Sequence, residues 1–244
     1  MAHPDVHWIV PVIGGEGRGD DEDTCAPFLA DVRTFLGQNP HPLSSDWIEH
    51  LGGKQKVVQI SVKESARIQR LLSLKAHSGG YKVVVLWMPE SLNDSAANKL
   101  LKLIEEPLDR TILLLISHDL GLMRDQVDRV MVMYGGTVVE SASTPDLFQK
   151  RAHPYTQGLF AARPQLGLKR GTRLQTIPGN VPEIFNWPQG CAFADRCPHA
   201  EASCRMAVPL PEQIHAHPNS DSSSMQTHDH WVSCLKWQQL EASV

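Results

Sequence analysis

Apolar and polar positions in the first half of this chain predict a mixed α/β fold. Residues 81–88 and 111–117 are continuous apolar runs, a pattern typical of strands buried on both faces of a parallel sheet. Between them, residues 96–106 repeat apolar side chains at helical spacing, and Asn93 and Asp94 precede this run as candidate caps. Strand, helix and strand in this order predict a right-handed βαβ unit.

Weaker patterns predict further elements around this unit. The segment from 14 to 25 is rich in glycine and acidic residues, which favours a solvated loop. The remaining apolar spacings predict strands at residues 7–13 and 57–62 and helices at residues 28–36, 47–51, 65–75 and 119–127.

The second half begins with a hairpin signal and then loses its periodicity. Residues 129–134 and 137–140 are strand candidates on either side of Gly135 and Gly136, a pair that favours a two-residue turn. A short helix with proline in its first turn is predicted at 144–148. Beyond residue 163 the chain is proline-rich and irregular, so we expect a crosslink to be needed there to offset the entropy of ordering.

Composition narrows the class of protein. The formal net charge is only −4, so no global basic field attracts nucleic acid, and we expect no sequence-specific nucleic-acid binding. The longest apolar runs are strand-sized and too short to cross a bilayer. The N-terminus lacks the basic and apolar regions of an export signal. These features predict a cytoplasmic protein, in which cysteines stay mostly reduced.

Four of the five cysteines gather near the C-terminus. Cys25 stands alone and is predicted to be a lone thiol, whereas Cys191, Cys197, Cys204 and Cys234 offer enough sulfur ligands for tetrahedral zinc or an iron–sulfur cluster. Their spacing lacks the tight C-x2-C pair of a zinc ribbon, so buried cysteines without metal are the alternative.

Four histidines lie close to these cysteines in sequence and could add metal affinity. They fall within residues 214–230, a stretch rich in serine, histidine and aspartate that more often forms a mobile, solvated linker. These histidines are His215, His217, His228 and His230.

The chain has no recognisable means of holding a triphosphate by itself. Phosphate binding needs a glycine-rich loop, a lysine and a hydroxyl group for Mg²⁺, yet no G-x-x-x-x-G-K-[ST] occurs. The glycine-rich residues 14–19 precede four acidic residues that would repel phosphate. At the end of the strand at 82–88, where an aspartate would orient the metal, Trp87, Met88 and Pro89 leave Glu90 displaced. We therefore expect ATP and Mg²⁺ to bind only if a partner supplies the loop.

Residues 1–117 resemble the clamp-loader δ′ subunit of bacterial DNA polymerase III. The resemblance is carried by residues 96–107 and by Trp87-Met88-Pro89-Glu90 before them. It implies a partial AAA+ type α/β core in which the strand at 111–117 carries a sensor residue. The Ser-Arg-Cys motif of that family is missing after this strand, which weighs against clamp-loader activity.

From residue 114 onward the chain is similar to the ATPase subunits of oligopeptide, dipeptide and nickel ABC importers. The matching segments are residues 114–121, 128–136, 153–159, 177–182 and 190–198. The resemblance implies an H-loop and hairpin region at 118–150 and a C-terminal domain at 151–244. It also implies a γ-phosphate sensor at His118 and a four-iron–four-sulfur cluster on the four C-terminal cysteines. A histidine satisfied by local backbone is the simpler alternative for His118.

Together these observations predict a partial P-loop-NTPase-like α/β fold followed by a small irregular cysteine-bearing domain. The expected function is that of an ATP-binding-subunit-like component of a peptide or nickel importer, truncated or fused, that does not hydrolyse ATP independently. Its expected partners are permease and ATPase subunits at the inner face of the membrane. The alternatives are a δ′-like subunit with polymerase III clamp-loader partners, and a composite chain that folds only in part.

Overall fold

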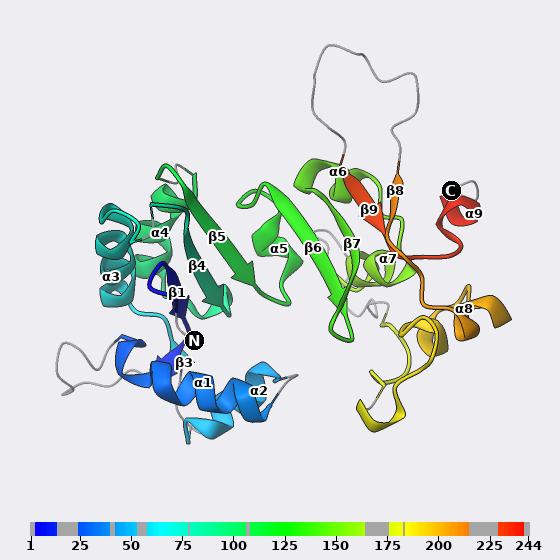
Figure 1. Cartoon of the computed structure of the whole chain (residues 1–244), viewed down its shortest axis with the longest axis horizontal. Coiled ribbons are helices and arrows are strands. Elements are labelled where there is room, and N and C mark those ends of the chain that lie inside the picture. The colour runs from blue at the N-terminus through cyan, green and yellow to red at the C-terminus, as the bar shows by residue number, and fades with distance from the viewer. Residues whose placement is uncertain are drawn as a thin grey trace, which may run out of the picture. The chain divides into compact units, whose positions relative to one another are not determined.

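The computed structural model divides the chain into two compact units, Met1–Leu122 and Met123–Val244 (Figure 1). The residues described are 3–13, 24–39, 42–52, 58–77, 79–105, 108–163, 176–182, 184–214 and 229–241. Among them no helix is long and apolar enough to cross a membrane. The division at residues 117 and 150 that the family resemblance implies stays a prediction.

The first unit is built on a parallel three-stranded sheet with strand order β1-β4-β5. Its strands are β1 (Val6–Ile9), β4 (Lys82–Trp87) and β5 (Thr111–Ile116). Val84 in the central strand pairs with His7 on one side and Leu113 on the other. The predicted strand–helix–strand unit and the mixed α/β fold are therefore confirmed.

Two amphipathic helices, α3 (Val62–Ser73) and α4 (Asp94–Glu105), pack against one face of this sheet (Figure 1). Asn93 caps α4 as predicted, since its Oδ1 accepts a hydrogen bond from the amide of Ala96 at 2.8 Å. The buried cluster between helices and sheet consists of Ile9, Ile60, Ile68, Leu72, Val84, Leu86, Leu100 and Leu103.

The predicted strand at 57–62 is shorter than expected, because β3 spans only Val58–Gln59 and pairs with β2 (Val12–Ile13). The reason is that the Ser61 hydroxyl accepts a hydrogen bond from the amide of Glu64 and so starts α3 at the next residue. Residues 53–57 and most of the predicted loop at 14–25 lie outside the described residues.

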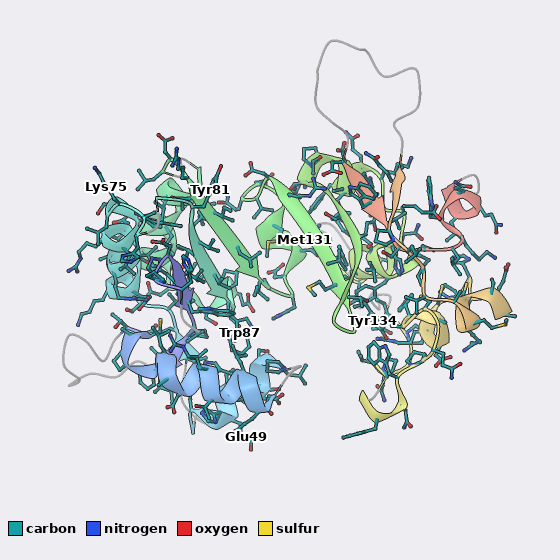
Figure 2. The ribbon with its side chains drawn as sticks, viewed as in Figure 1. Glu49, Lys75, Tyr81, Trp87, Met131 and Tyr134 are labelled. Atoms are coloured by element: carbon teal, nitrogen blue, oxygen red, sulfur yellow. The ribbon has the colours of Figure 1, made fainter. Side chains whose placement is uncertain are left out.

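A second cluster forms beside the end of β4, where α1 (Leu29–Gln38) and α2 (Ser44–His50) follow the turn η1 (Ala26–Phe28). Trp87 lies at the end of β4 (Figure 2), and its ring is 6.5 Å from Phe35 and 6.1 Å from Trp47. The Trp47 indole donates a hydrogen bond to the Pro11 carbonyl at 2.9 Å. The predicted lone thiol of Cys25 is fully buried in this cluster.

Strand β5 corrects the expectation that both faces of the 111–117 strand are buried. Leu113 and Leu115 pack into the cluster beneath α3 and α4. On the opposite face Ile112, Leu114 and Ile116 are 47%, 38% and 42% exposed, because no described helix of the first unit packs against them. The predicted helix at 119–127 is also shorter, since α5 spans only Leu120–Met123.

The second unit carries an antiparallel sheet with strand order β6-β7-β9-β8. Its strands are β6 (Arg129–Tyr134), β7 (Thr137–Ser143), β8 (Glu212–Ile214) and β9 (His230–Val232). The predicted hairpin of β6 and β7 is confirmed. Gly135 and Gly136 both have positive φ angles, 56° and 79°, as the two central residues of such a tight turn require.

The rest of this unit consists of short helices and turns. The Ser143 hydroxyl caps α6, which has Pro145 in its first turn as predicted. The helices are α6 (Thr144–Gln149), α7 (Pro154–Ala161), α8 (Ala202–Met206) and α9 (Trp237–Glu241), and single 3-10 turns occur at Ile184–Asn186 and Ala194–Arg196.

Candidate cofactor site

The four C-terminal cysteines line a single pocket in the second unit. Cys191, Cys197, Cys204 and Cys234 surround about 350 Å³ of empty volume, which includes space open to solvent. Three of them lie on one stretch of chain from Gly190 to α8, with Cys204 inside α8, and Cys234 follows β9. The pocket thus joins residues from both ends of the irregular region.

Backbone contacts hold the three nearby cysteines in place. The amide of Cys191 donates a hydrogen bond to the carbonyl of Cys204 at 2.8 Å, and the carbonyl of Cys191 accepts one from Ala194. Gly190 lies so close to the same segment that a Cβ atom placed on it would be 2.4 Å from the Cys204 oxygen. A residue without a side chain is therefore required at this point.

Other residues complete the walls of the pocket. His153 and Pro154 at the start of α7 form one wall, and Leu235, Lys236 and Leu240 form another. The ring of His153 also caps α7, because its Nδ1 accepts a hydrogen bond from the amide of Tyr155 at 3.0 Å.

Burial controls the protonation of these groups. Burial raises the pKa of the Cys191 and Cys197 thiols, and it raises the pKa of Cys234 to about 11, with the other cysteines adding like-charge repulsion in each case. The pKa of His153 is lowered to about 4 by burial, against the opposing pull of the Glu140 carboxylate. At neutral pH the three thiols are thus protonated unless a bound cation stabilises their thiolates.

The donor set has the chemistry of a sulfur-ligated cofactor, although the described residues form no closed site for a single ion. Four thiols face one pocket, which is the ligand chemistry of iron–sulfur clusters and of structural zinc. However, no three histidine, cysteine or acidic side chains among the described residues stand close enough to hold one metal ion.

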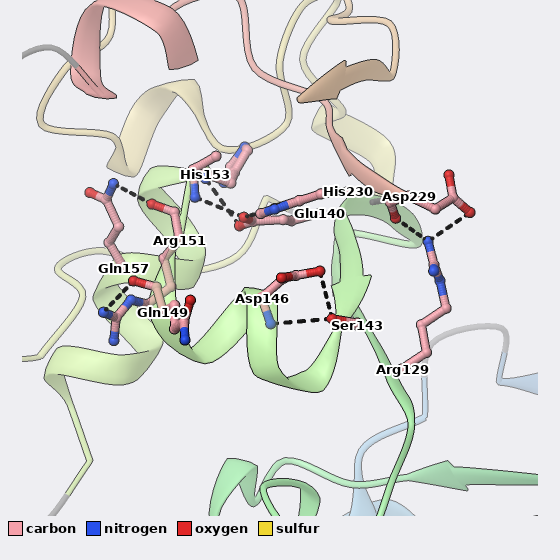
Figure 3. Close-up of polar contacts among 11 residues, drawn as sticks. Arg129, Glu140, Ser143, Asp146, Gln149, Arg151, His153, Gln157, Asp229 and His230 are labelled. Atoms are coloured by element: carbon pink, nitrogen blue, oxygen red, sulfur yellow. Dashed lines mark hydrogen bonds and ion pairs between the residues drawn. The ribbon is translucent and has the colours of Figure 1, made fainter. Parts of the chain in front are cut away.

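Of the four histidines predicted to lie in a linker, the structure describes only His230, and for this residue the prediction is wrong. His230 begins β9 and is buried, with its Nε2 at 2.8 Å from Oε1 of Glu140 (Figure 3). It does not line the cysteine pocket. The other three, His215, His217 and His228, lie outside the described residues.

His118, the predicted phosphate sensor, belongs to the first unit. It follows β5 with its side chain 78% exposed, and its Nδ1 lies 3.3 Å from Oε1 of Glu90. The second oxygen of Glu90 accepts a hydrogen bond from the Ser117 hydroxyl at 2.7 Å. Met88 turns the chain between β4 and Glu90 with a left-handed φ of 59°, which brings the displaced carboxylate to the end of β5. Sequence reasoning missed this pairing of Glu90 with Ser117.

Sequence reasoning also missed Glu140. This side chain is buried in the second unit and accepts hydrogen bonds from the amides of Ala152 and His153 (Figure 3). A carboxylate directly after two valines of a predicted strand was the available signal, because a charge that is buried there needs several partners.

Two family models match different parts of the chain. Residues 1–127 match the family model described as DNA polymerase III, delta subunit. The chain belongs to the DNA polymerase III delta subunit family. Residues 139–204 match a second model, described as the oligopeptide/dipeptide transporter, C-terminal region. The predicted composite resemblance is thus confirmed, and this delta-family chain also carries a transporter-type segment.

Three individual proteins that are similar to this delta-family chain are named as peptide import ATP-binding proteins. A Brucella ovis protein named as a peptide import ATP-binding protein is 38% identical over 135 residues, covering 53% of this chain and 36% of the relative. Relatives with the same name in Brucella melitensis and Brucella abortus are 34% and 39% identical over 186 residues, covering 75% of this chain and 49% of each relative. The chain therefore spans between about a third and a half of these relatives.

The two longer alignments extend the similarity to peptide import ATP-binding proteins beyond the second unit. They cover 75% of the chain, more than the half of it that lies in Met123–Val244, so they run into the first unit. Among solved structures, a DNA polymerase III gamma subunit-related protein from Thermotoga maritima has a TM-score of 0.32 and 18% identity, covering 55% of this chain and 31% of that one.

Proposed function

We propose that this chain is an ATP-binding-subunit-like component of a peptide or nickel importer, in which the second unit carries a cysteine-ligated cofactor. One observation carries the proposal. Cys191, Cys197, Cys204 and Cys234 line one pocket, and three of them lie within the segment that matches the oligopeptide transporter C-terminal region.

The cofactor we propose is a four-iron–four-sulfur cluster, with zinc as the alternative. The four cysteine thiolates would hold it, since all four cysteines line the same pocket. When bound, such a cluster supplies electron transfer or a covalent crosslink, and a crosslink would order the irregular region around it. His153 and Leu235 would help to shield it from solvent, since both line the pocket.

We further propose that the chain does not hydrolyse ATP by itself. The sequence contains no phosphate-binding loop, and Glu90 at the end of β4 is held by the Ser117 hydroxyl. A nucleotide and its Mg²⁺ would then be held by a partner ATPase subunit. The exposed imidazole of His118 at the end of β5 is free of the core and could reach a γ-phosphate presented by such a partner.

Reconstitution tests the cofactor. Anaerobic treatment of the reduced chain with iron and sulfide, followed by iron and sulfide analysis and visible absorbance, should give a coloured protein with about four irons per chain. A matched sample loaded with zinc tests the alternative. A colourless product in which all four thiols remain open to alkylation, and which retains no zinc, would refute the cofactor.

Copurification tests the partners. The tagged chain should retain the permease and ATPase subunits of a peptide importer, and through them lie at the inner face of the membrane. Retention of polymerase III subunits in their place would favour the second candidate.

That second candidate is a δ′-like assembly subunit of the clamp loader. It is supported by the family match over residues 1–127 and by the parallel sheet that α3 and α4 cover. It also needs no phosphate-binding loop. The transporter-type segment at 139–204 and its cysteine pocket have no role in this candidate, so we place it second.

A further inference from the structure

A single buried carboxylate connects three segments of the second unit. Glu140 on β7 is 1% exposed, and both of its oxygens accept hydrogen bonds. Oε1 accepts from the amide of Ala152 at 2.7 Å and Oε2 from the amide of His153 at 3.0 Å. His230 Nε2 is 2.8 Å from Oε1 (Figure 3). All three partners are buried, so water cannot replace these contacts without opening the core.

Two of the segments that Glu140 holds form walls of the cysteine pocket. His153 and Pro154 line it directly. His230 begins β9, and the chain leaving β9 reaches the pocket at Cys234. The fourth thiol is therefore brought to the other three by the strand that His230 anchors.

Besides the contact with Glu140, β9 is held by a short backbone ladder and by exposed side-chain contacts. The Ser233 hydroxyl donates to the Val138 carbonyl at 3.3 Å, and Arg129 on β6 pairs with Asp229, just before β9, at 3.1 Å. The ladder between them consists of two residue pairs, Glu140 with Val232 and Ser141 with Trp231, followed by the hydrogen bond from the Ser233 amide to the Val139 carbonyl. So short a ladder specifies its register weakly, and a slip of one residue would turn each side chain of β9 to the other face. The contact between His230 and Glu140 is a buried side-chain restraint on this register, whereas the Arg129–Asp229 pair is exposed to solvent.

We propose that Glu140 is the positioning residue of the cysteine site, setting the register of β9 for Cys234 and the place of the His153 wall. The purpose of this positioning rests on the proposed cofactor, whereas the contacts that achieve it lie within the protein itself. Because binding and docking are reciprocally linked, a cofactor that needs Cys234 also stabilises the docked β9.

Alkylation of the cofactor-free chain tests the positioning directly. The variant His230→Phe keeps the bulk of the ring but loses the contact with Glu140. In Glu140→Gln, the side-chain NH2 group faces a backbone N–H that also donates, so one hydrogen bond is lost. The variant His230→Gln again offers Glu140 a hydrogen-bond donor. We expect His230→Phe and Glu140→Gln to raise the alkylation rate of Cys234 about tenfold or more relative to Cys191, and His230→Gln to restore much of the protection.

A matched control separates positioning from general loss of stability. Ser143→Ala removes the cap of α6 on the same strand but touches neither wall of the pocket. It should lower the thermal midpoint without changing the ratio of Cys234 to Cys191 alkylation. Equal acceleration of all four thiols in both His230→Phe and Glu140→Gln would overturn the proposal.

Cofactor loading gives a second readout. Loading of the wild-type chain should slow hydrogen exchange at residues 229–234, whereas His230→Phe should take up less iron and sulfide and show weaker visible absorbance. Selective exposure of Cys234 with no uptake by the wild type would overturn the proposed cofactor while supporting the positioning by Glu140. Normal uptake in both disruptive variants would overturn the positioning and leave the cofactor standing.

Discussion

The amide of Cys191 donates a hydrogen bond to the carbonyl oxygen of Cys204 across 2.8 Å, so one backbone contact sets the relation of two pocket thiols. The close approach of these segments depends on Gly190, where any side chain would meet the backbone of Cys204 and Arg205. Cysteine spacing alone does not reveal this constraint.

Gly190→Ala should therefore damage the pocket. The added methyl group would lie 2.4 Å from the Cys204 oxygen, so the two segments must separate. We expect a loss of about 1–3 kcal/mol in the free energy of unfolding of the second unit, and a marked loss of iron uptake. Gly80→Ala is the matched control, because no atom lies within 4 Å of its added Cβ. Unchanged urea unfolding and iron content in Gly190→Ala would contradict the role of this glycine.

Stability of the second unit should decline in mild acid because of His153. The pKa of His153 in the folded chain, about 4, lies below the ordinary value of 6.5, so the unfolded chain binds the proton more readily between these values. Its contribution is complete above pH 6.5 and is lost as pH falls toward 4, with a slope of up to roughly 1 kcal/mol per pH unit.

His153→Asn provides the control for that effect, since asparagine can still cap α7 but does not titrate. Urea unfolding of both proteins at several pH values between 4 and 7 gives the difference in slope. Parallel pH profiles for wild type and His153→Asn would show that this histidine does not contribute.

Cys25 should be unreactive in the folded chain. Burial and the neighbouring Glu64 carboxylate raise its pKa to about 12, although Arg67 opposes them. At pH 8 we expect its alkylation in the native protein to be at least about a hundredfold slower than in urea, because the thiolate is the reactive form. Mass spectrometry of a peptide containing Cys25 measures this, and comparable rates in both conditions would contradict the burial of this thiol.

His118→Ala should leave the fold intact but affect an assembled transporter. The side chain is 78% exposed, so the free energy of unfolding should change by less than about 0.5 kcal/mol. In a complex with a partner that supplies the phosphate loop, we expect ATP turnover to fall about tenfold or more, as lost polarisation of the γ-phosphate predicts. Lys75→Ala, an exposed change in the same unit, is the control. Wild-type turnover by His118→Ala in that complex would rule out the sensor role.

Local signals in the sequence predicted much of the fold. The cap at Asn93 and the glycine pair between β6 and β7 act on neighbouring residues, and both were visible as patterns. The burial of β5 was not predictable in the same way, because an apolar run does not reveal which of its faces is covered. The contact between Glu140 and His230 joins residues 90 positions apart, and the polar stretch before His230 favoured a linker.

The separation of Glu140 and His230 by 90 positions in the sequence also predicts the order in which parts of the second unit fold. Closing a loop of this length costs more chain entropy than forming the β6–β7 turn, so the hairpin can form early while β9 must wait. We therefore expect Cys234, which follows β9, to reach the pocket after the other three cysteines during folding.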